Sequence, residues 1–195
     1  MKKVAFLLIV FTIGMIPMLY AGKKTLTIPL VYKPDREDKG VVLDVTQLAQ
    51  KPIKLEKFAD GRSDKMKIAE NVEDDEPRPV FCSSDVPDFI REVTRKELSL
   101  LGLTISDTNP SYTLVGDVSE FFVTEKNTYE AIVVVRYTLK DRNDKILYVG
   151  VARGNASNFG RSYKAENYQE VLSTAILNMV AALVKQEGFQ KALRQ

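Results

Sequence analysis

Three consecutive stretches of the chain, 112–124, 129–140 and 145–153, alternate apolar and polar positions. This alternation is typical of antiparallel strands with one buried face. The polar segments 125–127 and 141–144 separate the stretches and predict tight turns. Together they predict a three-strand meander. Ile132 and Val134 lie on the opposite face of the middle strand and indicate cover there too, either from an N-terminal arm or from a contact between copies of the chain.

Two segments instead show the three- and four-residue spacing of amphipathic helices. The first runs from Val86 to Leu101, with Ser84 or Asp85 as its N-cap and Gly102 at its end. In the second, Asn167 and Glu170 resemble a capping box. Its apolar stripe is formed by Tyr168, Val171, Leu172, Ala175, Met179, Ala182 and Leu183. Both helices are expected to cover a sheet.

The remaining segments complete the predicted architecture. Residues 26–32 alternate as an extended arm would, and 52–59 form a further strand. The polar segments 63–79 and 154–165 are predicted to be loops. The expected fold class is therefore α+β: an antiparallel sheet of about four strands, two helices packed on one face, and an N-terminal extended arm. The arm would span 22–49, and a single domain 50–195.

The N-terminus has the layout of a secretory signal peptide. Lys2 and Lys3 precede an apolar run over 4–20, which ends at Ala21 and Gly22. We expect residues 1–21 to be a signal peptide cleaved after Ala21. The alternative is an uncleaved membrane anchor, because a large residue, Leu19, stands where the cleavage site normally has a small one. Either way the protein is expected to be exported and to be periplasmic or envelope-associated.

Composition narrows the function classes. The chain has 28 Lys and Arg against 26 Asp and Glu. Two of the lysines lie in the signal segment, so the mature chain would be neutral, and no nucleic-acid partner is expected. The absence of histidine excludes Ser-His-Asp triads, Cys-His dyads and HExxH metalloproteases. No cofactor or metal site is predicted. The one cysteine, Cys82, is expected to be a buried apolar residue, the alternative being a reactive or intermolecular thiol.

Two segments hold candidate binding residues. The first is the turn at 60–62, where Asp60 and Arg62 could contact a ligand. The alternative is structural: Asp60 would accept backbone hydrogen bonds, Gly61 would be left-handed, and Arg62 would pair with a carboxylate such as Asp64. The second is the predicted loop 154–165, whose candidate contacts are Asn155, Asn158, Phe159 and Arg161. A carboxylate pair such as Asp60 and Asp117 could act as acid and base if both faced one cleft.

The order of elements, with Asp60 and Arg62 as an Asp-x-Arg signature after the strand, resembles the YajG-like envelope lipoproteins. Their relatives include auxiliary lipoproteins of envelope transport systems and the periplasmic domain of the curli secretion lipoprotein. The resemblance covers about residues 50–193. It implies an envelope-bound domain that works through protein contacts rather than catalysis. Those relatives carry a lipidated cysteine at the mature N-terminus, where this chain has Ala21 and Gly22.

Two functions remain at this stage. The first is a non-enzymatic accessory protein of envelope assembly or transport, whose partners would be envelope proteins or further copies of itself. Its contacts would be a sheet edge, the 155–162 segment or the arm. The second is a periplasmic carrier of a small apolar ligand or lipid, with a pocket between helices and sheet lined by Phe89, Val133 and Met179.

Overall fold

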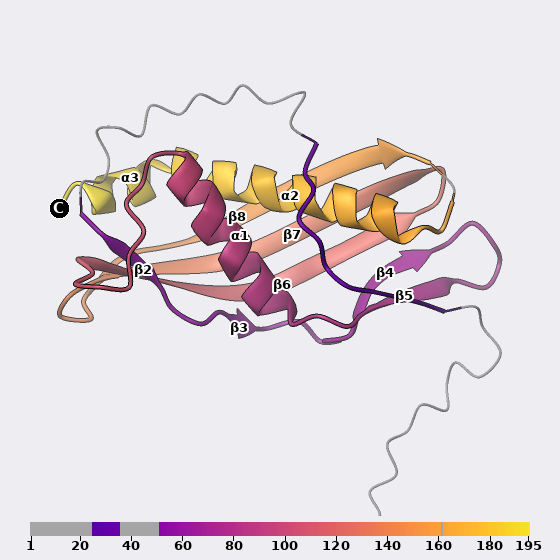
Figure 1. Ribbon diagram of the computed structural model, residues 1–195, viewed down its shortest axis with the longest axis horizontal. Helices are drawn as coiled ribbons and strands as arrows, with labels where there is room; N and C mark the ends of the chain where they lie inside the picture. The colour runs from indigo at the N-terminus through magenta and orange to yellow at the C-terminus, as the bar shows by residue number, and fades with distance from the viewer. Residues whose placement is uncertain (1–24, 36–50, 161) are drawn as a thin grey trace, which may run out of the picture.

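The computed structural model describes residues 25–35, 51–160 and 162–195, and it confirms the predicted meander (Figure 1). The meander consists of β6 (Tyr112–Glu125), β7 (Thr128–Asp141) and β8 (Ile146–Phe159), each 14 residues long. β6 pairs antiparallel with β7, and β7 with β8. The predicted signal segment 1–21 and most of the predicted arm lie outside the described residues.

The fold-class prediction of a four-strand antiparallel sheet is wrong, because the described residues form an eight-stranded mixed sheet with three helices. Five short strands join the meander: β1 (Leu26–Ile28), β2 (Ile53–Leu55), β3 (Ala59–Asp60), β4 (Lys67–Asn71) and β5 (Arg78–Cys82). Strands β2, β3 and β4 pair one after another with β6, all parallel to it. They act as one interrupted strand along the side of β6.

The segment 63–79 is not the loop that its polarity predicted. It contains β4 and the start of β5, which pair antiparallel with each other. Strand β4 reads Lys-Ile-Ala-Glu-Asn, and Asn71 in it is fully buried. Such a strand has too few apolar positions to stand out from a loop when only its own sequence is considered.

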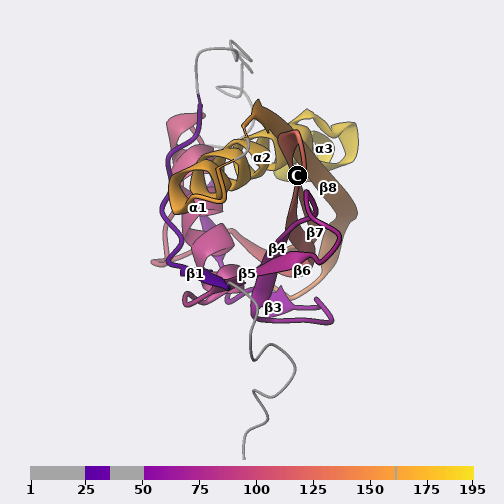
Figure 2. The same ribbon diagram turned by 90° about the vertical axis from the view of Figure 1, so that its right-hand side faces the viewer.

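Three helices cover one side of the sheet: α1 (Val86–Leu100), α2 (Ala165–Lys185) and α3 (Glu187–Leu193). Figure 2 shows α1 and α2 on the concave side of the curved sheet, and α3 packs against β8 through Phe189 and Tyr148. Helix α1 starts as predicted, because the Asp85 side chain accepts a hydrogen bond from the backbone N–H of Asp88. The predicted capping box of α2 is wrong: Lys164 is its N-cap residue and makes no side-chain cap bond.

The concave face of the meander and the helices form the core. Val133, Val135, Tyr137 and Met179 are fully buried there. Gly154 of β8 lies so close to α2 that an added Cβ would stand 1.9 Å from the backbone oxygen of Ala175. Only glycine allows this approach, so β8 and α2 pack almost backbone to backbone.

The described part of the N-terminal arm lies across α1 and α2 rather than over the outer face of the sheet (Figure 2). Its burial alternates as predicted, and Ile28 enters the core. Polar side chains bind its backbone: Ser173 Oγ accepts from the N–H of Lys33 at 2.9 Å, and Gln169 Nε2 donates to the carbonyl of Pro29 at 2.8 Å. The described arm therefore does not cover Ile132 and Val134 on the other face, where Val134 is nevertheless only 7% exposed between Glu120 and Arg153.

Candidate functional site

The Asp60–Arg62 turn stands where the interrupted strand beside β6 is broken between β3 and β4. Arg62 folds back and donates from Nε and Nη2 to the two carboxylate oxygens of Asp60, at 2.9 and 2.8 Å. Nη2 also donates to the carbonyl of Lys65 at 2.8 Å. Arg62 therefore pairs with Asp60, not with Asp64, and its side chain is 6% exposed although it is charged.

Gly61 does not take the left-handed conformation that the sequence predicted. Its role is close approach, because an added Cβ would lie 2.8 Å from Asp117 Oδ1. Burial alone would raise the pKa of the Asp60 carboxyl, but the hydrogen bonds and charge of Arg62, with the nearby Lys65 ammonium, hold that pKa below its ordinary value. The turn is thus an internally neutralised ion pair.

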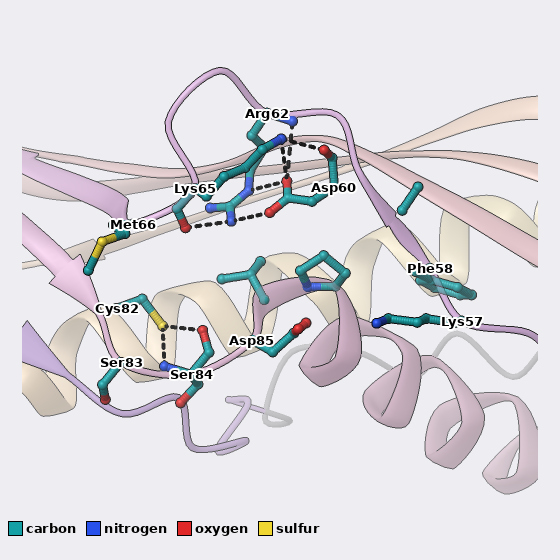
Figure 3. Close-up of a pocket in the computed structure, with 13 residues that line it drawn as sticks. Lys57, Phe58, Asp60, Arg62, Lys65, Met66, Cys82, Ser83, Ser84 and Asp85 are labelled. Carbon is teal, nitrogen blue, oxygen red and sulfur yellow. Dashed lines mark hydrogen bonds and ion pairs between the residues drawn. The ribbon is translucent and has the colours of Figure 1, made fainter. Parts of the chain in front are cut away.

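A cavity of about 750 Å³ opens between this turn and the start of α1 (Figure 3). Asp60, Arg62, Met66, Cys82 and Asp85 contribute to its lining. Cys82 is buried, as predicted, and its Sγ accepts a hydrogen bond from the N–H of Ser84 at 3.2 Å. Burial raises the pKa of the Cys82 thiol, which makes it a poor nucleophile at neutral pH. Figure 3 shows the carboxylate of Asp60 turned to Arg62 rather than to the open space.

Asp60 and Asp117, the carboxylates that could act as acid and base, do not face one cleft. Asp60 lies opposite Val118, which is buried on the concave side, whereas Asp117 is exposed on the other face of β6. Asp60 lines the cavity and Asp117 is not among its lining residues. The geometry therefore gives the two carboxylates no common substrate position.

The predicted loop 154–165 is wrong over its first half, because β8 continues to Phe159. Asn155 points outward, and its carbonyl accepts a hydrogen bond from Asn178. Asn158 points inward and donates to Glu170 Oε1 at 2.8 Å. Phe159 is 90% exposed at the end of the strand. The structure thus separates these candidates onto two faces, and Arg161 lies outside the described residues.

The convex side of β6, β7 and β8, here called the open face, is not covered by any of the three described helices (Figure 2). Ile146, Val149 and Val151 on β8 are 57%, 50% and 55% exposed there. Val115 of β6 lies in the same cross-strand row as Val149. These side chains form an apolar patch at the end of the face near the β7–β8 turn.

Charged residues occupy the middle of the open face. Arg136 on β7 lies between Asp117 on β6 and Val151 on β8. One row further on, Val134 lies between Glu120 and Arg153, whose charged groups are 4.0 Å apart. The positive charges of these two rows are therefore on β7 and β8, and the negative ones on β6.

The free edge of β8 is partly closed by side chains from α2 and from Gln186, which connects α2 to α3. Gln186 Nε2 donates to the carbonyl of Val151 at 2.9 Å, and Asn178 Nδ2 donates to that of Asn155 at 2.7 Å. Side chains that cap edge carbonyls oppose the addition of another strand. Of the surfaces that β8 offers, the open face is more accessible to a partner than the edge.

A buried polar network holds the connection between β8 and α2. The carboxylate of Glu125, fully buried, accepts hydrogen bonds from the Tyr168 hydroxyl and from the backbone N–H of Tyr163. Burial would raise the pKa of Glu125, but these hydrogen bonds lower it below its ordinary value. Burial, together with the contact to Glu125, raises the pKa of Tyr168. The connection is therefore fastened to β6, and this fixes the end of β8 that carries Phe159.

Sequence reasoning missed Val149, Val151, Arg136 and Arg153 as surface candidates. The available signal was that the predicted strands carry valine at outward positions, where polar residues are usual on a solvated sheet face. Glu125 was assigned to a turn, and no local pattern distinguished this carboxylate from the exposed ones.

The comparisons with known proteins bear on the fold. No known family model and no curated protein matches the sequence. A Xanthomonas campestris protein of family DUF330 has a similar structure, with a TM-score of 0.53 and 10% identity, covering 86% of this chain and 96% of that one. The structure of an uncharacterised protein is similar with a TM-score of 0.52 and 11% identity, covering 81% of this chain and 95% of that one. A minor lipoprotein from Acinetobacter baumannii has a TM-score of 0.44 and 11% identity, covering 72% of this chain and 94% of that one.

At such identities the likeness to the first two structures, whose TM-scores exceed 0.5, shows a shared fold and nothing more, and it extends over most of each chain. None of these structures carries the YajG-like name, so that finer resemblance stays a prediction. Within residues 25–35, 51–160 and 162–195, no helix is long and apolar enough to cross a membrane. Those same residues hold no group of three or more side chains suited to binding a metal ion.

Proposed function

We propose that the protein is an exported, envelope-associated protein without catalytic activity, which works by binding other protein chains through its open face. The observation that carries this proposal is the patch of Ile146, Val149 and Val151, three apolar side chains at least half exposed on a sheet face without helix cover. Exposed apolar groups that lie together on a rigid scaffold favour association with another protein.

The cavity beside the Asp60–Arg62 turn gives little support to a catalytic function. Asp60 and Arg62 hydrogen-bond to each other, with Arg62 Nη1 buried and without a hydrogen-bond partner, and Cys82 has a raised pKa. A catalytic carboxylate or thiol normally has a free approach and a pKa suited to proton transfer or attack. The carrier function gains no support from its predicted pocket, because Val133 and Met179 are fully buried in the packed core.

Export and envelope association rest on the N-terminal sequence, with its basic start, apolar run and small residues at 21–22. The YajG-like resemblance agrees with this location. Fractionation of cells that produce the full chain, with determination of the N-terminal residue, tests it. A protein in the cytoplasmic fraction with Met1 intact would contradict export.

Site-specific photo-cross-linking in the same cells tests the binding surface. A photoreactive residue at Val151 is expected to give covalent adducts with a defined protein. The matched control is Leu100 at the end of α1, which is 63% exposed and apolar but lies on the helix side. If position 100 gave the same adducts as position 151, or if neither gave any, the open face would not be the binding surface.

A further inference from the structure

We propose that the cavity between the Asp60–Arg62 turn and the start of α1 binds a small organic monoanion, a carboxylate attached to an apolar group, through Nη1 of Arg62. The inference goes beyond the proposed function, because none of the residues that line this cavity lies on β6, β7 or β8. It is carried by one buried hydrogen-bond donor that the fold leaves without an acceptor.

The donor is one of the three guanidinium nitrogens of Arg62. The Asp60 carboxylate and the Lys65 carbonyl accept from Nε and Nη2, whereas Nη1 is buried and has no hydrogen-bond partner. The side chain is only 6% exposed, so bulk water does not reach this atom. The centre of the Phe121 ring lies 6.0 Å from Cζ, at the limit of a cation–π contact, and the ring has no oxygen that could accept the bond. A buried charged donor without an acceptor costs free energy, which a bound anion would recover.

The pairing with Asp60 holds the guanidinium at the wall of the cavity. Because Asp60 occupies the edge formed by Nε and Nη2, Nη1 lies at the opposite edge. Figure 3 shows the Arg62 side chain across the open space from Cys82 and Asp85. Nη1 has almost no accessible surface, so a lining side chain must move before an anion reaches it. Met66 is suited to this movement, since it is unbranched, flexible and 61% exposed.

The charged residues of the lining favour a ligand with a single negative charge. They are Lys57, Arg62 and Lys65 against Asp60 and Asp85, which leaves one positive charge. The carboxylate of Asp60 is paired with Arg62, and that of Asp85 accepts from the N–H of Asp88 as the cap of α1. A monoanion would therefore neutralise the cavity, whereas a dianion would leave it with an excess of negative charge.

The remaining lining suits an apolar group. Phe58, Met66, Val86 and Pro87 contribute carbon-rich surface. The volume of about 750 Å³ lies within the range of small-molecule sites, roughly 300–1,000 Å³. A carboxylate alone would fill little of this space, so the ligand has an apolar body as well. A fatty acid and the C-terminal end of a peptide share this chemistry.

Titration with small probes tests the proposal. The protein, purified as it accumulates in the cell, is expected to bind octanoate with a dissociation constant of about 1 mM or tighter, followed by NMR of the ¹⁵N-labelled chain. Octanol lacks the charge and acetate lacks the apolar body, so each is expected to bind at least tenfold more weakly. The shifted amide signals should belong to residues 57–66 and 82–87. N-acetyl-leucine represents a peptide end, and whichever of it and octanoate binds more tightly identifies the source of the ligand.

Two variants test the residues that the proposal names. Arg62→Lys keeps the charge but removes Nη1, and is expected to weaken octanoate binding at least tenfold. Lys57→Glu reverses an exposed charge of the lining and is expected to weaken it at least fivefold. Lys185→Glu, an exposed charge at the end of α2, is the matched control and should leave the affinity unchanged. Circular dichroism checks the fold of each variant, and Lys57→Glu with the NMR mapping decides if Arg62→Lys does not fold.

Several results would overturn the inference. They are the absence of binding by both octanoate and N-acetyl-leucine up to about 10 mM, octanol binding as tightly as octanoate, and shifted signals that belong to other parts of the protein. Unchanged affinity in Lys57→Glu or in folded Arg62→Lys would do the same. The proposed function fails separately, because it is tested by cross-linking at position 151 on the open face.

Discussion

The two faces of the β6–β8 meander are built from alternate residues of the same strands, yet they differ in nearly every respect. On the concave face Val133, Val135 and Tyr137 are fully buried under helices. On the open face Val149 and Val151 are half exposed beside Arg136 and Arg153. Neighbours along one strand thus belong to different environments. The concave side supplies the stability of the fold, and the open face is free for association.

The largest expected loss of stability comes from a substitution on the concave face of β8, compared with one at the adjacent residue on the open face. Gly154→Val would place a side chain against the backbone of α2, where an added Cβ already stands 1.9 Å from the Ala175 oxygen. We expect a loss of more than about 3 kcal/mol in the free energy of unfolding, or no folded protein.

Asn155→Val, one residue further along and exposed, is the matched control. It is expected to change the free energy of unfolding by less than about 0.5 kcal/mol. Urea denaturation followed by circular dichroism measures both variants. Equal effects at the two positions would mean that β8 does not pack against α2 as described.

The second comparison is between two glutamates of β6. Glu125→Ala removes the acceptor of the Tyr168 hydroxyl and the Tyr163 N–H in a buried site, and should cost about 3 kcal/mol. Glu120→Ala on the open face should cost less than about 0.5 kcal/mol. Chemical denaturation at pH 7 checks both values, and a small loss for Glu125→Ala would contradict its role in fixing the connection.

The same glutamate makes stability depend on pH in a defined direction. Its folded-state pKa lies below the ordinary value, so its contribution is present above about pH 4.3 and is lost as the pH falls through the folded-state pKa. Glu125→Gln should therefore lose less stability than wild type between pH 5 and about pH 3. Thermal melts across this range measure the difference, which should be absent in Glu120→Gln.

A smaller effect is expected at the turn that interrupts the sheet. Asp60→Asn leaves the buried Arg62 guanidinium without its counter-charge and should cost about 1–3 kcal/mol at neutral pH. Because the Asp60 pKa is lowered in the folded protein, the gap between variant and wild type should narrow as the medium becomes acidic. Asp117→Asn serves as control in the same melts and should be close to neutral, because Asp117 is exposed on the other face of β6, next to Val118, the residue paired with Asp60.

The smallest effect on stability should accompany the largest effect on binding. The double variant Val149→Thr with Val151→Thr keeps β-branched residues at both positions and should unfold within about 0.5 kcal/mol of wild type. It should nevertheless lose the adducts expected from the open face. Retained adducts, measured with the photoreactive residue at Ile146, would show that the apolar patch is not needed for binding.

The sequence was informative where a segment carried its own periodicity. The three long strands, α1 with its Asp85 cap, and the alternation of the arm were predicted because each places apolar residues at regular steps. Strands β2, β3 and β4 pair with β6 residues far along the chain, and no local pattern in Ile53–Leu55 or Lys67–Asn71 specifies a parallel partner.

The error at 154–159 has a physical cause of its own. Gly154, Ala156 and Ser157 are small residues, which local statistics associate with loops. In the structure β8 needs a residue without a side chain at position 154 because α2 approaches closely, so the requirement comes from tertiary packing. Asp60 and Arg62 were predicted either to contact a ligand or to be structural, and their mutual hydrogen bonds favour the structural alternative.

The hydrogen bonds between the N-terminal arm and α2 can form only after most of the chain has been synthesised. The backbone of residues 29–35 is held by Gln169, Ser173 and Thr174, which lie about 140 positions later in the chain. At roughly 5–20 residues per second, the chain needs on the order of ten seconds to extend from one set to the other. Leu26–Ile28 can pair with β5, and the Leu30 N–H with Ser84, once the chain has grown by about 54 residues. The partners of residues 29–35 on α2 are made last, so the two ends of this short segment can be secured at different times during synthesis.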